Sequence, residues 1–150
     1  MALRWMFAAL HLLALGIGLG AIWTRSRAFR EPLDRAGLAR VFSADGWWGA
    51  AAALWLVTGV TRVLSSLDKG QEYYINNRLF LLKMILFVTI VVLEVAPMRA
   101  LIRWRREVRA GELPDTTRAP AFATRSTVQA VLVVLMVIAA AGMARGLGMT

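Results

Sequence analysis

Two ionisable side chains interrupt a stretch that otherwise suits the interior of a membrane. Residues 77–96 read NRLFLLKMILFVTIVVLEVA, in which Lys83 and Glu94 stand among aliphatic and aromatic residues. Charged groups inside membrane helices are costly, and they commonly mark pathways for ions, protons or cofactors. Lys83 and Glu94 are therefore the first candidates for chemistry in this chain.

The spacing of the polar residues in this stretch predicts one helical face. Asn76, Lys83 and Glu94 follow one another at intervals of seven and eleven residues, which places them along one stripe of a helix. Eleven residues span about 16 Å of helix axis. Lys83 and Glu94 are thus too far apart to pair with each other, and each needs its own partner.

The single histidine of the chain is a candidate partner for Lys83. Counted from the ends of their apolar runs, His11 and Lys83 lie at similar depths in a bilayer. Thr58, Thr61 and Arg62 of the second apolar run along the chain fall near the same level. We expect a small polar site in the outer half of a helix bundle, built from His11 and Lys83 together with Thr58 or Thr61.

Each of these residues also has a purely structural interpretation. The long stem of Lys83 can carry its ammonium group out to the headgroups. His11 can form a hydrogen bond to a neighbouring helix without binding any ligand. Glu94 can form an ion pair near the inner interface, with Arg99 or with an arginine of the first loop. These interpretations stay open beside the functional ones.

The elements that position these residues are four long apolar runs. Hydrophobic residues make up 59% of the chain, and the runs have the length that a helix needs to cross the hydrocarbon layer. We expect an all-α fold, a transmembrane four-helix bundle that forms a single integral membrane domain over 1–150. The expected helices cover about 5–24, 46–64, 78–98 with a continuation to about 110, and 126–145. A cleaved signal peptide is the alternative for the first run, but the arginines that follow it favour a retained helix.

The connection after the first run carries further helix signals. Pro32 and Asp34 are typical of a helix start, and a weak apolar stripe follows them. This predicts a short amphipathic helix in the first cytoplasmic loop, or an inward extension of the second run. Ser43 or Asp45 is a candidate cap for the helix that follows. Pro97 predicts a kink in the third helix.

The charge distribution predicts how the chain lies in the membrane. The net charge is +9, and residues 24–46 and 97–126 hold 12 of the 18 lysines and arginines. The positive-inside rule puts both segments in the cytoplasm. We therefore expect a multi-pass protein of the bacterial inner membrane with both termini outside. The partner is the lipid bilayer rather than nucleic acid, since the arginines flank apolar runs.

Composition narrows the choice of cofactors and partners. The chain has no cysteine and one histidine, which excludes disulfides and thiolate metal sites, and the methionines are scattered. No metal site is expected. Gly16 and Gly20 form one close-packing pair, and Gly49 and Ala53 form another. Such faces are compatible with a homo-oligomer.

Three stretches carry a resemblance to a known family. They are ALHLLALGIGLGAIW at 9–23, DGWWG at 45–49, and LFLLKMILF at 79–87 followed by Glu94. The pattern resembles an uncharacterised bacterial family of predicted four-helix membrane proteins, over nearly the whole chain. This resemblance implies a topology and adds little chemistry.

The layout is also similar to the HemJ-type membrane protoporphyrinogen oxidases and the copper-resistance D proteins. The HemJ-type resemblance implies a haem b site, with His11 as an axial ligand and with Lys83 and Arg27 at positions where that group has a lysine and an arginine. Leu81 and Glu94 depart from it, because that group tends to have histidines there. With one histidine, a bis-histidine haem requires a dimer.

The activity itself is left open, including whether the chain is an enzyme. The first hypothesis is tetrapyrrole binding or redox chemistry through His11, with Lys83 or Arg62 pairing with a propionate or transferring protons. The second is a small transporter or a pathway for ions or metals, with Lys83 and Glu94 at its two ends. The third is an assembly factor of the membrane that has no substrate.

Overall fold

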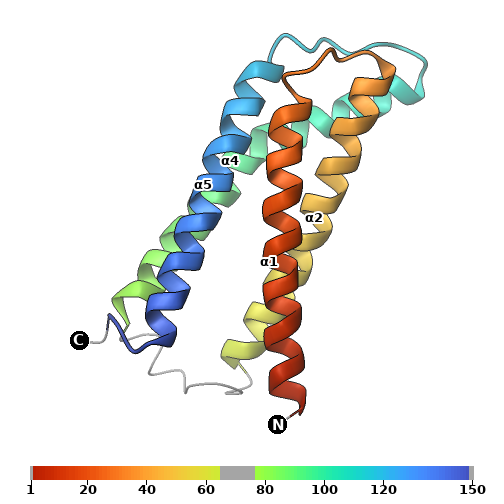
Figure 1. The fold of residues 1–150 in the computed structure, drawn as a ribbon. Coiled ribbons are helices and arrows are strands. Elements are labelled where there is room, and N and C mark those ends of the chain that lie inside the picture. The colour runs from red at the N-terminus through yellow and green to blue at the C-terminus, as the bar shows by residue number, and fades with distance from the viewer. Residues whose placement is uncertain (1, 65–76, 149–150) are drawn as a thin grey trace.

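The computed structural model describes residues 2–64 and 77–148, and four helices make up most of them. Their bounds, in chain order, are α1 (Ala2–Ala28), α2 (Arg35–Leu64), α4 (Arg78–Arg109) and α5 (Ala119–Ala144). The described part is thus an all-α bundle of long helices that run roughly side by side (Figure 1). The expected fold class is confirmed.

Three of the described helices are long and apolar enough to cross a membrane. These spans are Trp5–Ala28, Arg78–Arg109 and Ala119–Ala144. A helix is the natural form for such segments, because it satisfies every backbone N–H and C=O inside the bilayer. α2 was expected to be a fourth span, but it is not among the helices that meet this length and hydropathy criterion within the described residues.

The four helices do not pack evenly around the bundle. α1 packs along both α2 and α5, and α5 packs along α4, whereas α2 and α4 touch at few points. These contacts give the order α2, α1, α5, α4 around the bundle. The bundle is therefore least tightly packed between α2 and α4, and the candidate site lies on this side.

The amphipathic segment of the first connection is the first part of α2, not a separate helix. The Asp34 carboxylate accepts a hydrogen bond from the Gly37 N–H at 2.7 Å, which caps the helix at this point. A side chain on Gly37 would meet the Pro32 carbonyl oxygen, so glycine is required there. Ser43 and Asp45 lie inside α2, and neither is a cap. An extension of the second helix is thus the alternative that the structure adopts.

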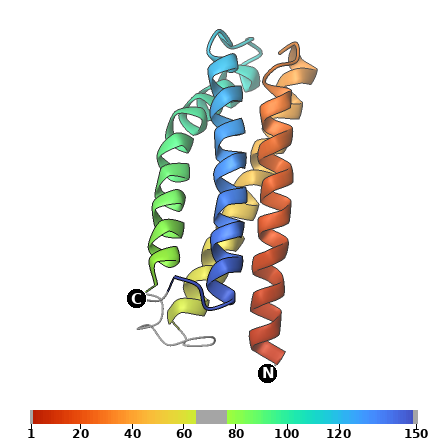
Figure 2. The ribbon, with the colours of Figure 1, turned by 60° about the vertical axis from the view of Figure 1, so that its left-hand side comes forward.

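α4 is bent, capped and longer than its apolar run. Its first N–H groups donate to the Asn77 side chain, at 2.9 Å from Leu79 and 3.3 Å from Phe80. Pro97 is buried inside the helix, and α4 bends in the half that contains this proline (Figure 2). Beyond the bend, Trp104 of α4 packs in an apolar core with Phe29 and Phe122.

Candidate functional site

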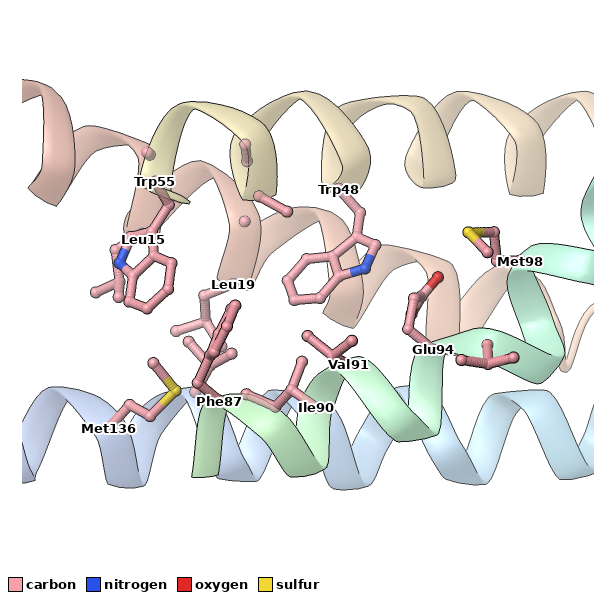
Figure 3. Close-up of a pocket in the computed structure, with 16 residues that line it drawn as sticks. Leu15, Leu19, Trp48, Trp55, Phe87, Ile90, Val91, Glu94, Met98 and Met136 are labelled. Atoms are coloured by element: carbon pink, nitrogen blue, oxygen red, sulfur yellow. The ribbon is translucent and has the colours of Figure 1, made fainter. Parts of the chain in front are cut away.

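A groove opens between α2 and α4, on the side where these helices touch least. It encloses about 200 Å³. α2 contributes Trp48 and Trp55, and α4 contributes Phe87, Val91 and Glu94 (Figure 3). Except for the Glu94 carboxylate and the two indole nitrogens, the described side chains that line the groove consist of carbon and methionine sulfur.

Small residues create the space in this groove. Ala14 and Gly18 of α1 form part of its floor, and Ala51 and Ala52 of α2 lie between the two tryptophans along the helix. Because these positions carry at most a methyl group, the space beside the indole rings stays open. The aromatic walls still meet at one point, where the Trp55 and Phe87 rings lie with their centroids 5.4 Å apart.

The first polar cluster lies at one end of the groove, around Trp55, and we call it the Trp55 cluster (His11, Trp55, Thr58 and Lys83). The His11 ring stacks on the Trp55 indole, with centroids 5.1 Å apart and an interplanar angle of 24°. The Lys83 ammonium lies 5.3 Å from the centre of the same indole, within cation–π range. His11 and Lys83 therefore meet at Trp55, although neither residue lines the groove itself.

Hydrogen bonds in the Trp55 cluster indicate which nitrogen of His11 carries the proton. His11 Nδ1 lies 2.9 Å from the Thr58 hydroxyl, and that hydroxyl donates to the Leu54 carbonyl oxygen at 2.7 Å. A hydroxyl has one proton to donate, so Thr58 accepts from His11 Nδ1–H. The lone pair of the neutral imidazole then lies on Nε2. A metal-ligating histidine is commonly held in this way, through its other ring nitrogen.

Of the remaining residues predicted for this end, the structure describes the side chains of Thr61 and Arg27. Thr61 donates to the Val57 carbonyl oxygen of its own helix at 2.8 Å. Arg27 is exposed and lies sixteen residues from His11, about 24 Å along α1. The Arg62 side chain and Asn76 lie outside the described residues.

The second polar cluster surrounds Arg25 at the other end of the groove. Arg25 is fully buried, and its two terminal nitrogens each donate to one oxygen of Glu94 at 2.7 Å. One of these nitrogens also donates to Asp45 at 2.7 Å. A guanidinium suits this arrangement, because its planar fork matches the two oxygens of a carboxylate.

Three further side chains complete what we call the Arg25 cluster (Arg25, Asp45, Glu94, Arg105, Ser126 and Gln129). Gln129 donates to Glu94 at 2.8 Å and accepts from Arg25 at 3.2 Å, and the Ser126 hydroxyl accepts from Arg25 at 3.3 Å. Arg105 donates to Asp45 at 2.7 Å. The cluster joins all four described helices, and its two arginines balance its two carboxylates.

Sequence reasoning found part of this second cluster. It gave Glu94 an ion pair with Arg99 or with an arginine of the first loop; the partner is Arg25, whereas Arg99 is exposed. Arg25 was among the arginines assigned to the first loop, so the prediction included the correct partner, but α1 continues to Ala28 and buries this residue. Gln129 was the missed signal, since a primary amide inside an apolar run needs partners of its own.

No metal centre is formed by the described residues. Among them, no three side chains of histidine, aspartate or glutamate gather closely enough to hold an ion. The two carboxylates of the Arg25 cluster are bound by arginines instead.

Comparison with known families agrees with the apolar, helical character of the chain. A family model described as "Predicted membrane protein (DUF2214)" matches residues 3–148, nearly the whole chain. The chain belongs to this family. The resemblance to an uncharacterised family of membrane proteins is confirmed, and the three apolar helices of the described residues suit a membrane protein.

The other comparisons add no relative. No match was found among curated proteins or among solved structures. The similarity to HemJ-type oxidases and copper-resistance D proteins is therefore not shown for this DUF2214 protein. The lipid environment follows from its apolar helices, whereas its ligand has to be argued from the groove and its two clusters.

Proposed function

We propose that this DUF2214 protein binds a small ring-containing hydrophobic molecule, which enters the groove between α2 and α4 sideways from the bilayer. The observation that carries this proposal is the groove itself, an aromatic-walled space of about 200 Å³ between helices of a membrane protein. Ligand sites in helical proteins commonly lie between helices and combine apolar walls with a few polar groups.

The size of the groove limits its ligand. A dry protein cavity of about 150 Å³ with aliphatic and aromatic walls holds one benzene molecule. A space of about 200 Å³ therefore suits one substituted ring, not a whole tetrapyrrole. Because the α2–α4 side is loosely closed, a hydrocarbon tail on that ring can extend from the groove into lipid.

The proposed setting is the bacterial inner membrane, with four spans and both termini outside. α2 packs along α1 over much of its length (Figure 1), which supports α2 as the fourth span beside a membrane-crossing α1. The arginine-rich connections lie together at the end of the bundle opposite the start of α1 (Figure 1). The positive-inside rule favours that end as the cytoplasmic one.

The binding test uses a ring probe in lipid nanodiscs. Para-nonylbromobenzene quenches indole fluorescence, and occupation of the groove adds a saturable component, from Trp48 and Trp55, to the non-saturable quenching by probe in the lipid. We expect Val91→Phe to remove the saturable component, because Val91 lines the groove. The matched control is Val92→Phe, since Val92 is 64% exposed and lies outside the groove. Equal saturable quenching in all three proteins would exclude the groove as the binding site.

A haem at His11 is the second candidate, and one observation favours it. The hydrogen bond to Thr58 leaves the His11 lone pair on Nε2, as axial ligation of iron requires. In this case Lys83, which lies against the same indole, would pair with a propionate. An absorption spectrum of the purified protein decides the question. A Soret band that His11→Ala abolishes would establish ligation, and a flat visible spectrum after expression with ample haem would exclude it.

A further inference from the structure

Glu94 gives the groove a hydrogen-bond acceptor. It is the one charged residue among the described residues of the lining, and its side chain stays 20% exposed although it is paired with Arg25. Oε2 accepts from both Arg25 and Gln129, whereas Oε1 accepts from Arg25. A carboxylate oxygen can accept two hydrogen bonds, so Oε1 has capacity for one more donor.

Trp48 gives the same part of the groove a hydrogen-bond donor. Its indole lines the groove, and its ring nitrogen lies on the side that faces Glu94 (Figure 3). An indole nitrogen donates and does not accept. The Glu94 end thus presents one acceptor and one donor, whereas the Trp55 indole N–H is the one polar side-chain group of the described lining at the other end.

The charge balance of the Arg25 cluster argues against a cationic ligand. Glu94 and Asp45 are already neutralised by Arg25 and Arg105, with three ion-pair distances of 2.7 Å. An added ammonium group would therefore leave an excess positive charge in a low-dielectric site. A neutral group that both donates and accepts a hydrogen bond fits this end without changing its charge.

We propose that the molecule bound in the groove is a phenol-type lipid, a ring with a hydroxyl group at one end and a hydrocarbon tail at the other. This inference rests on the proposed function. The hydroxyl donates to Glu94 and accepts from the Trp48 N–H, the ring lies beside Trp48 and Phe87, and the tail leaves between α2 and α4. Hydrogen bonds to charged groups are the stronger ones, so we expect loss of the donor to cost roughly ten-fold or more in affinity.

The test compares two probes that differ in the hydroxyl proton. Para-nonylphenol and para-nonylanisole compete with the brominated probe in nanodiscs, at concentrations corrected for their partition into lipid. In the wild type we expect the phenol to displace the probe at roughly one-tenth of the anisole concentration or less. Trp48→Phe keeps a ring and removes the N–H, and Glu94→Gln removes the charge. In each variant we expect the phenol and anisole concentrations needed for displacement to lie closer together than in the wild type.

The outcomes separate this inference from the proposed function. Equal displacement by phenol and anisole in the wild type would overturn the hydroxyl assignment, while a saturable signal that Val91→Phe abolishes would preserve the groove. Loss of any saturable signal in the wild type would overturn both. The wild-type comparison decides even where Glu94→Gln fails to fold, and a preference that survives in Trp48→Phe and a folded Glu94→Gln would also overturn the assignment.

Discussion

At the residue scale, the side chain that most constrains this molecule is Arg25. Its guanidinium is fully buried and holds two carboxylates from two other helices. A buried ion pair gains little over well-packed apolar groups, but it becomes very costly when one partner is removed. Arg25 therefore gives the bundle a specific arrangement, in which α2 and α4 are held to α1 at one end of the groove.

The first prediction concerns the loss of that guanidinium. Arg25→Gln should lower the free energy of unfolding by about 3–5 kcal/mol, because Asp45 and Glu94 then remain in the bundle without their shared counter-ion. Arg27→Gln is the matched control, two residues away and exposed, and should change stability by less than about 1 kcal/mol. Unfolding in mixed detergent micelles measures both. Equal stability of the two variants would show that the Arg25 cluster is dispensable.

Sequence reasoning at this scale found candidates more easily than pairings. Lys83, His11 and Glu94 stand out because apolar neighbours surround them in the chain. The meeting of His11 and Lys83 at Trp55 depends on the rotation of three helices, which no spacing within one helix determines. The functional roles assigned to these residues stay predictions.

At the element scale, the C-terminal tail and the start of α4 hold each other. The Asn77 side chain caps α4 and also donates to the Leu147 carbonyl oxygen at 3.1 Å. The Arg78 N–H donates to the Gly148 carbonyl oxygen at 2.9 Å. Two N–H groups near the helix start thus find acceptors in residues that lie about seventy positions away.

The second prediction tests this docking with two glycines of similar backbone conformation. Gly146 and Gly148 have φ of 82° and 84°, so alanine strains the backbone similarly at both positions. A Cβ at Gly148 would lie 2.8 Å from Asn77 Oδ1, whereas one at Gly146 meets nothing within 4 Å. Gly148→Ala should therefore speed amide hydrogen exchange in the first turn of α4 by roughly five-fold or more relative to Gly146→Ala, the effect of losing about 1 kcal/mol of capping. Equal exchange rates would contradict the docking.

Element boundaries show where local signals succeed and where they lose to tertiary contacts. Asn77, Asp34 and Pro97 act through local chemistry. The sequence analysis identified Asp34 as part of a helix start and Pro97 as the site of a kink, but not the Asn77 cap. The extension of α1 to Ala28 was not expected, because the arginines after Trp23 suggested a loop. Burial of Arg25 against α5 and α4 stabilises that extra turn, and such partners cannot be read from one segment.

At the scale of the whole molecule, hydropathy and charge predict most of the architecture. Four apolar runs separated by short polar segments leave few alternatives to a helical bundle, and the described helices form one. The open α2–α4 side is different, since it reflects small residues on α1 and α2 that are common in any membrane helix. The groove could therefore not be found without the arrangement in space.

The third prediction concerns orientation. The chain has no cysteine, so a single introduced thiol can be labelled without background. Leu147→Cys should react with a membrane-impermeant maleimide in cells whose outer membrane has been opened, and Glu112→Cys should react only after lysis. Both positions are exposed, and they lie at opposite ends of α5. The reverse pattern would mean that the arginine-rich connections face outside, against the positive-inside rule.

The most direct measurement for the whole account is native mass spectrometry of the protein released from membranes. Wild type, Val91→Phe and Val92→Phe would be compared for small molecules that stay bound. We predict that a lipid-soluble ring molecule remains with the wild type and with Val92→Phe, and that it is lost from Val91→Phe because the added ring fills the groove. The same bound molecules in all three proteins, or none in the wild type, would contradict a ligand in the groove between α2 and α4.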